Sequence, residues 1–138
     1  MPAYPDSPLL DLLYRPDLHI LTARWLRDAP LEDLQAAHRA LQAKAHTYNS
    51  FCWLMDRRRL NPTAEIAQWV AHEWLPAVVR EATAPLRLAS LVSPELWQFI
   101  STQNGFRDAT TTVLAAHQPY HVKVFMDEGE AVRWLTGK

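Results

Sequence analysis

The sequence predicts an α/β fold in which a mixed, mostly parallel sheet is combined with helices in the order ββαβαβαβα. A short apolar run precedes the turn Arg15-Pro16-Asp17 and an alternating run follows it, which is typical of a β-hairpin. After the hairpin, short apolar runs alternate with longer amphipathic segments, as they do where helices connect parallel strands. The 138 residues are enough for one domain with a core, so we predict a single domain over residues 1–138.

Five strands are predicted from the apolar runs. They span residues 9–14, 18–26, 51–55, 86–92 and 120–126. The third run is apolar from Phe51 to Met55, as expected of a central strand that is covered on both faces. The last run alternates around Val122, Val124 and Met126. Residues 1–8 contain three prolines, and we predict an extended lead-in there.

Amphipathic periodicity and cap signals predict the helices. They span residues 30–46, 63–83, 93–103, 108–117 and 127–135. Ser93 is a typical N-cap residue, and Asp127 and Glu130 have the spacing of a capping box. Pro76 is expected to kink the second helix or to end its first segment. In residues 108–117 three consecutive threonines lower the helix propensity, so the short helix predicted there is ambiguous.

Composition excludes several classes of protein. The formal net charge of −1 provides no basic field for nucleic acid, and the longest apolar runs are too short for a membrane span. The N-terminus does not resemble a secretory signal. Because Cys52 is the only cysteine, no intrachain disulfide can form, and we predict a cytoplasmic protein.

The most informative segment of the chain is residues 51–76. In it, an apolar strand ends at Asp56, three arginines follow, and a helix begins. Sites in open α/β sheets form at the carboxyl ends of strands, beside helix N-termini, and guanidinium groups there could bind phosphate, carboxylate or an acidic partner. The alternative is a solvated loop in which one arginine pairs with Asp56. The candidate binding residues are Asp56, Arg57, Arg58, Arg59, Asn61, Thr63 and Trp74.

The tryptophans of the second helix allow two interpretations. In one, Trp69 anchors the core while Trp74 is exposed near Pro76 and marks a protein contact. In the other, the aromatic side chains line a pocket for a lipid or an aromatic ligand between the second helix and the sheet. The first interpretation is favoured, and the second is kept as an alternative.

No motif for catalysis, metal binding or a cofactor stands out. No two of the six histidines are convincingly spaced as metal ligands, and three glycines cannot form a glycine-rich phosphate loop. Capping explains Asp127 and Glu130, which removes the main pair of carboxylates for acid–base catalysis. Cys52 lies in a predicted buried strand without a basic neighbour that would activate a thiolate. We therefore predict a protein that is not an enzyme and has no cofactor.

Three features of the chain resemble the small bacterial STAS/SEC14-like, or anti-sigma-factor-antagonist-like, domain family. They are the strand ending in Asp56-Arg57, the turn Trp74-Leu75-Pro76, and the ending formed by Phe125, Asp127-Glu128 and Ala131 to Leu135. The resemblance extends from about Leu9 to Leu135, and it implies a STAS-like sheet in a domain that binds proteins or small ligands. Anti-sigma-factor antagonists carry a phosphorylated serine after the strand, whereas arginines follow Asp56 here. Control by that phosphorylation is therefore not expected.

Together these observations predict a regulatory or scaffolding module that binds another protein, or a second copy of itself, without nucleic acid. Its contact face would be the loop at residues 56–63, extended by Ser93-Pro94 at the end of the neighbouring strand. The alternative function is a carrier that holds a small molecule or lipid in an apolar pocket between the second helix and the sheet.

Overall fold

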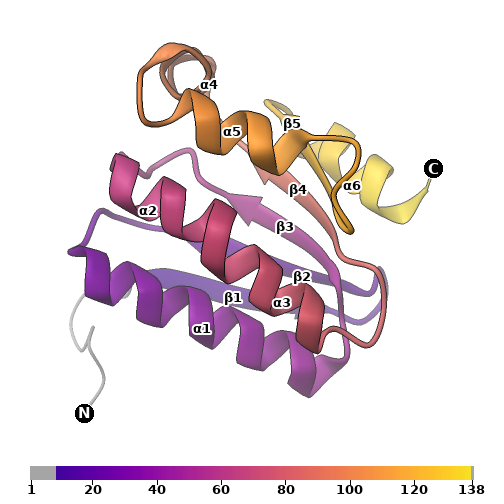
Figure 1. The fold of residues 1–138 in the computed structure, drawn as a ribbon. Coiled ribbons are helices and arrows are strands. Elements are labelled where there is room, and N and C mark those ends of the chain that lie inside the picture. Colours follow the sequence, from indigo (N-terminus) through magenta and orange to yellow (C-terminus); the bar gives the residue numbers. More distant parts are fainter. Residues whose placement is uncertain (1–8, 138) are drawn as a thin grey trace.

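The computed structural model describes residues 9–137, and the predicted lead-in at residues 1–8 lies outside this range. A five-stranded sheet has the order β1-β2-β3-β4-β5 (Figure 1). The strands are β1 Leu10–Arg15, β2 Ile20–Trp25, β3 Cys52–Asp56, β4 Arg87–Leu91 and β5 His121–Phe125. The hairpin strands β1 and β2 are antiparallel, and every later pair is parallel. The structure thus confirms the predicted α/β class, its mostly parallel sheet and the order of its elements.

Helices cover both faces of this sheet. They are α1 Leu31–Tyr48, α2 Ala64–Trp69, the π-helical turn η1 Val70–Trp74, α3 Leu75–Glu81, α4 Pro94–Thr102, α5 Arg107–Leu114 and α6 Glu128–Thr136. In Figure 1, α1, the α2–α3 segment and α5 lie over one face, and α6 lies over the other. The ambiguous segment at residues 108–117 is helical over most of its length, as predicted.

Local sequence signals explain where several helices begin. Oγ of Ser93 accepts a hydrogen bond of 3.0 Å from the backbone N–H of Leu96, and the carboxylate of Asp127 accepts one of 2.9 Å from that of Glu130. These contacts satisfy N–H groups that have no partner within the first helical turn. The N-caps predicted for α4 and α6 are confirmed.

The helix at residues 64–81 changes its winding before Pro76. Proline has no N–H with which to bond the carbonyl four residues earlier, and η1 directly precedes the turn that contains it. This break into α2, η1 and α3 agrees with the expectation that Pro76 ends the first helical segment. The π-helical turn also shifts the faces of α3 relative to those of α2, because it holds more residues than an α-helical turn.

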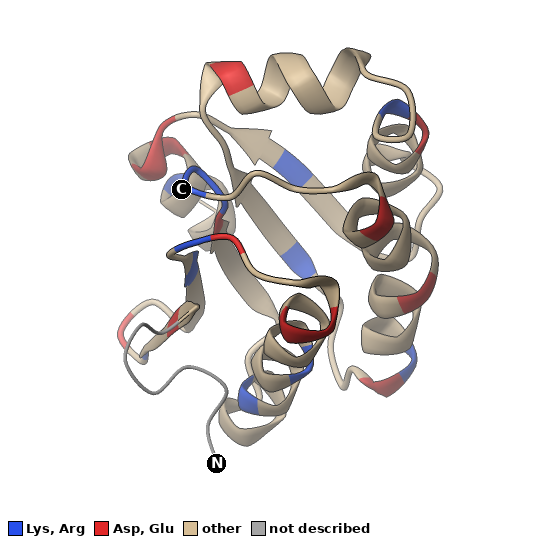
Figure 2. Ribbon diagram, turned by 90° about the vertical axis from the view of Figure 1, so that its left-hand side faces the viewer, with Lys and Arg blue, Asp and Glu red and all other residues tan. Residues whose placement is uncertain are grey.

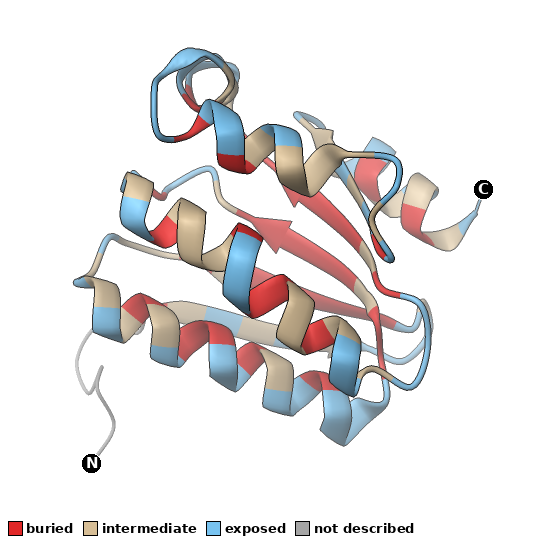
Figure 3. Ribbon diagram, viewed as in Figure 1, coloured by how far each residue is buried: buried red, intermediate tan, exposed pale blue. Residues whose placement is uncertain are grey.

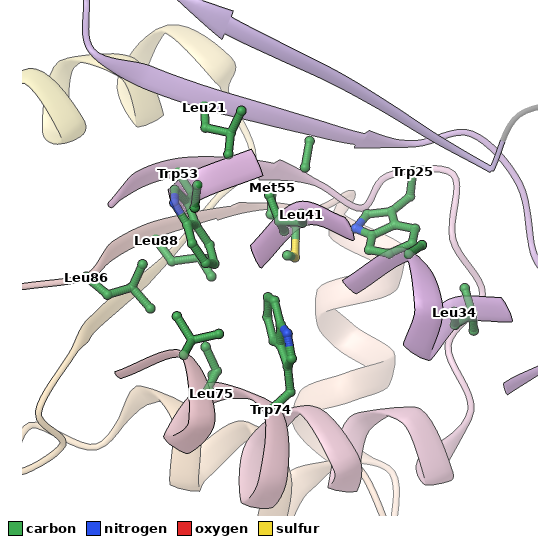
Figure 4. Packing of buried hydrophobic residues seen from close by; sticks show 14 of the residues in the cluster. Leu21, Trp25, Leu34, Leu41, Trp53, Met55, Trp74, Leu75, Leu86 and Leu88 are labelled. Carbon is green, nitrogen blue, oxygen red and sulfur yellow. The ribbon is translucent and has the colours of Figure 1, made fainter. Parts of the chain in front are cut away.

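The core lies on both sides of β3 and β4, which are buried along almost their whole length (Figure 3). Trp53 and Met55 point toward α1 and the α2–α3 segment, whereas Leu54 points toward α6. Figure 4 shows Trp25, Trp53 and Trp74 among leucines in the larger cluster. The prediction that β3 is a central strand covered on both faces is therefore confirmed.

None of the helices within residues 9–137 combines the length and apolar character that crossing a membrane requires.

Candidate functional site

The three arginines after β3 lie in three different environments. The N–H of Arg57 donates a hydrogen bond of 2.9 Å to the carbonyl of Leu91, so the backbone ladder between β3 and β4 continues one residue past Asp56. Successive side chains of an extended chain alternate between the two faces of a sheet. Accordingly, Arg57 shares a face with Met55, while Arg58 pairs with Asp56 on the opposite face. Arg59 is exposed.

Asp56 is the centre of an ion-pair network on the α6 face. Asp56 is 8% exposed, and its carboxylate accepts hydrogen bonds from Arg58, at 3.0 and 2.9 Å, and from Arg24, at 3.0 Å. Arg24 also makes a bidentate contact of 2.9 and 3.0 Å with Glu128, at the start of α6. Basic and acidic segments accordingly lie close together at this end of the molecule (Figure 2).

These contacts set the charge states of the network. Burial alone would raise the pKa of Asp56, but the hydrogen bonds from Arg58 and Arg24 outweigh it and hold this pKa below its usual value. The bond from Arg24 likewise lowers the pKa of Glu128. Two carboxylates therefore neutralise Arg24 and Arg58, and the structure agrees with the interpretation in which one arginine of the loop pairs with Asp56.

Asn61 and Thr63 have structural partners within the chain. The backbone N–H and the side-chain amide of Asn61 donate to the carboxylate of Asp28, at 2.7 and 3.1 Å, which ties the loop to the segment before α1. Oγ1 of Thr63 accepts from the N–H of Ile66 at 3.3 Å and caps α2. Both residues thus hold the loop in place between β3 and α2.

A cavity of about 90 Å³ lies between the sheet and the helices α2, η1 and α5. Most of its lining is apolar, from Met55 and Leu88 in the sheet to Val70 and Val113 in the helices. Arg57 and Ser90 provide polar groups at the ends of β3 and β4, where Nη1 of Arg57 donates a hydrogen bond of 3.1 Å to Oγ of Ser90. Of the seven predicted binding residues, Arg57 and Trp74 line this cavity, and the other five do not.

Arg57 is the charged group of this cavity. Burial lowers the pKa of its guanidinium to about 10, so the group remains a cation at neutral pH. Within residues 9–137, however, Arg57 makes no ion pair, and its side chain bonds only to the uncharged Ser90. Arg57 differs in this respect from Arg24 and Arg58.

Three aromatic residues complete the polar part of the cavity wall. Trp25 and Trp74 are 1% and 2% exposed, and within residues 9–137 neither indole N–H has a hydrogen-bond partner. The His38 ring lies between them, with ring centroids 4.6 Å from Trp25 and 4.7 Å from Trp74. Burial lowers the pKa of His38 to about 4, and the charge of Arg57 contributes, so the imidazole is neutral. Its Nδ1 lies 2.7 Å from the carbonyl of Leu34, which places the proton on Nδ1.

The prediction that Trp74 is exposed is wrong. Trp74 is almost fully buried and packs against Trp53 and His38, so a protein partner on the surface would not reach it. The π-helical turn that ends at Trp74 directs this side chain toward the sheet. Trp69, expected in the core, is the more exposed of the two tryptophans and packs at the edge of the same cluster.

Sequence reasoning did not identify Ser90, His38 and Trp25 as site residues. Ser90 carried a signal, since it is the only hydroxyl side chain within the apolar run at residues 86–92. His38 stands among the apolar positions of α1, which indicates a buried histidine but not a position in a cavity wall. Trp25 carried no such signal.

Comparison with protein-family models, curated proteins and solved structures found no match to this chain. The resemblance to STAS-like domains therefore stays a prediction. Within residues 9–137, His, Cys, Asp and Glu side chains do not gather in a group of three or more that could hold a metal ion. Burial raises the pKa of the Cys52 thiol, which disfavours a reactive thiolate.

Proposed function

We propose that this domain binds a small organic molecule in the cavity between the sheet and the helices α2, η1 and α5. The observation that carries this proposal is the cavity itself, whose wall is mostly apolar and contains the bonded pair Arg57 and Ser90 and a few further polar side chains. Binding sites for small molecules typically have this composition, with the apolar wall supplying affinity and the polar groups fixing orientation.

Ordinary packing of the core does not account for this arrangement. Protein interiors are close-packed, and buried polar groups without partners cost free energy. Here the cavity wall contains a guanidinium that makes no ion pair, and two indole N–H groups that make no hydrogen bond, within residues 9–137. A bound molecule would fill the space and provide the missing acceptors.

The size of the cavity restricts the ligand. Its volume is about 90 Å³, whereas an engineered apolar cavity of roughly 150 Å³ admits benzene. We therefore expect a ligand on the order of four to six non-hydrogen atoms, or one whose end alone enters the cavity. This is the carrier alternative in a restricted form, since a complete lipid would not fit.

Binding without catalysis is the mode that the contacts support. Within the described residues, Ser90 is bonded to a guanidinium rather than to a general base that would activate its hydroxyl. The nearby imidazole of His38 directs Nδ1 to a backbone carbonyl. The proposed activity is therefore that of a carrier or a ligand-responsive module.

Native mass spectrometry of gently isolated protein tests this proposal. We expect an added mass that corresponds to one small molecule and disappears on denaturation. The variant Ala109→Leu, which adds atoms to the cavity wall, should lose this mass, and Ala40→Leu on the exposed face of α1 should keep it. A protein that carries no added mass, and whose melting temperature responds to no member of a fragment library, would contradict the proposal.

A protein contact through the loop at residues 56–63 is the second candidate. Arg59 favours it, because this exposed guanidinium makes no ion pair within residues 9–137. Arg59→Glu should then abolish capture of a partner, or self-association in analytical ultracentrifugation. The exposed control Arg80→Glu should preserve both. Equal behaviour of the two variants would exclude this face.

A further inference from the structure

The groups around Arg57 also indicate which class of molecule the cavity binds, an inference that rests on the proposed function. We propose that the ligand is a small apolar monocarboxylate, whose carboxylate pairs with the guanidinium of Arg57 and whose hydrocarbon part fills the apolar end of the cavity.

The charge of Arg57 indicates that the ligand is an anion. Arg24 and Arg58, which lie nearby on the other face of the sheet, both contact carboxylates. Arg57 lines the cavity and has only the hydroxyl of Ser90 as a side-chain partner within residues 9–137. Arg57 is half-buried, and a charge that is partly withdrawn from water is stabilised by an opposite charge. An anion bound in the cavity would provide this pairing.

Donors outnumber acceptors among the polar groups of the wall, where the unprotonated Nε2 of His38 is an acceptor. The guanidinium and the indole groups of Trp25 and Trp74 can only donate hydrogen bonds. Figure 4 shows the indole nitrogens of Trp25 and Trp74 directed toward the space between the two rings. Ser90 already accepts a bond from Arg57, which leaves its hydroxyl proton to donate. An ionised carboxylate only accepts, and its two oxygens match a guanidinium in bidentate geometry.

The charge of the cavity wall favours a carboxylate over a phosphate. His38 is neutral in this environment, so it adds no second positive charge to that of Arg57. A single cation balances a monoanion, whereas phosphate would bring additional negative charge into a wall that is otherwise apolar. The side chains of Met55, Leu88 and Val122 offer the ligand only dispersion and hydrophobic contacts, which suit its hydrocarbon part.

Matched pairs of acids and alcohols test this inference. Propionate and propanol, and butyrate and butanol, are titrated into the protein at constant ionic strength, with inorganic phosphate as the anion control. We expect at least one acid to bind at least tenfold more tightly than its alcohol, and phosphate not to bind. Equal binding of acid and alcohol would overturn the carboxylate inference but leave the proposed function intact. Binding of phosphate alone would also overturn it, and no binding by any compound would count against both proposals.

Variants of the cavity wall assign the effect to Arg57. Arg57→Met keeps a long side chain without its charge, and it should reduce the ratio of acid to alcohol affinity to about one, while Arg80→Met should leave the ratio unchanged. Should Arg57→Met not fold, Ser90→Ala provides a second test, with weakened binding of the acid and unchanged binding of the alcohol. Acid binding that is the same in these cavity variants as in the wild type would overturn the role of Arg57.

Discussion

Nη1 of Arg57 lies 3.1 Å from Oγ of Ser90, and this contact joins the continuation of β3 to β4 inside the cavity. Arg58, the next residue in the chain, lies on the opposite face of the sheet and pairs with Asp56 at 2.9 Å. Two adjacent arginines therefore have opposite roles: the fold neutralises Arg58, whereas it leaves Arg57 without a carboxylate.

The variants Arg57→Met and Arg58→Met should differ in their effect on the stability of the ligand-free protein. Replacing Arg57 removes a half-buried charge that makes no ion pair within residues 9–137, so the free energy of unfolding should stay the same or rise by about 1 kcal/mol. Replacing Arg58 removes a partner of the buried Asp56 and should lower that free energy by about 1 kcal/mol. Urea unfolding measures both changes. A loss of more than about 2 kcal/mol in Arg57→Met would mean that the fold needs this charge.

Removal of the Asp56 carboxylate should destabilise the domain. In Asp56→Ala, Arg24 and Arg58 lose their shared partner, and we expect a loss of about 2 kcal/mol. This is less than for a fully buried pair, because both guanidiniums keep contact with water. Asp17→Ala, which breaks the exposed pair with Arg15, should leave the urea midpoint almost unchanged. Similar midpoints for the two variants would contradict the structural role of the Asp56 network.

Stability should fall as the pH drops below the usual pKa of His38. Burial lowers this pKa from 6.5 to about 4 in the folded protein, so the unfolded chain binds the proton more readily between these values. The stabilisation is complete above about pH 6.5, and about 3 kcal/mol of it is lost as the pH falls through this range to about 4.

Urea unfolding at several pH values between 7 and 4.5 measures this dependence. The variant His38→Gln cannot titrate and should show a flatter profile over the same range. The lowered pKa values of Asp56 and Glu128 place their own contributions at lower pH. The prediction fails if wild type and variant lose stability in parallel.

The N-cap of α4 should make a measurable contribution to stability. Ser93→Ala removes the acceptor for the N–H of Leu96 and should cost about 1 kcal/mol. Ser101→Ala, within the same helix, should change stability little, because Ser101 bonds to a carbonyl of its own helix. Thermal unfolding of the two variants provides the comparison, and an equal effect would remove the special role of Ser93.

The sequence was sufficient to predict the elements of the fold because their signals are local. The apolar run at β3, the turn at Arg15-Pro16-Asp17 and the caps at Ser93 and Asp127 all act within a few residues. The network around Asp56 depends instead on Arg24 and Glu128, which are distant in the sequence and become neighbours only through the strand order.

Most residues of the cavity wall were not predicted from the sequence, and only Arg57 and Trp74 of the seven predicted binding residues line the cavity. The alternation of side chains along a strand could have placed Arg57 and Arg58 on opposite faces of the sheet. The three arginines, however, resembled an exposed loop, in which side chains do not alternate in this way. The buried position of Trp74 depends on a π-helical turn that propensities do not predict. The cavity itself follows from how α2, η1 and α5 pack together, which no local pattern specifies.

The most direct test of carboxylate binding in the cavity is a titration of ¹⁵N-labelled protein, followed through its six indole N–H resonances. Each resonance is assigned from a single Trp→Phe variant, and butyrate is added with butanol as the comparison. We predict that butyrate shifts the resonances of Trp25 and Trp74 and leaves that of Trp134, on the other face of the sheet, in place. Saturable shifts confined to tryptophans outside the cavity, or no shift at concentrations that saturate a weak site, would contradict the central claim.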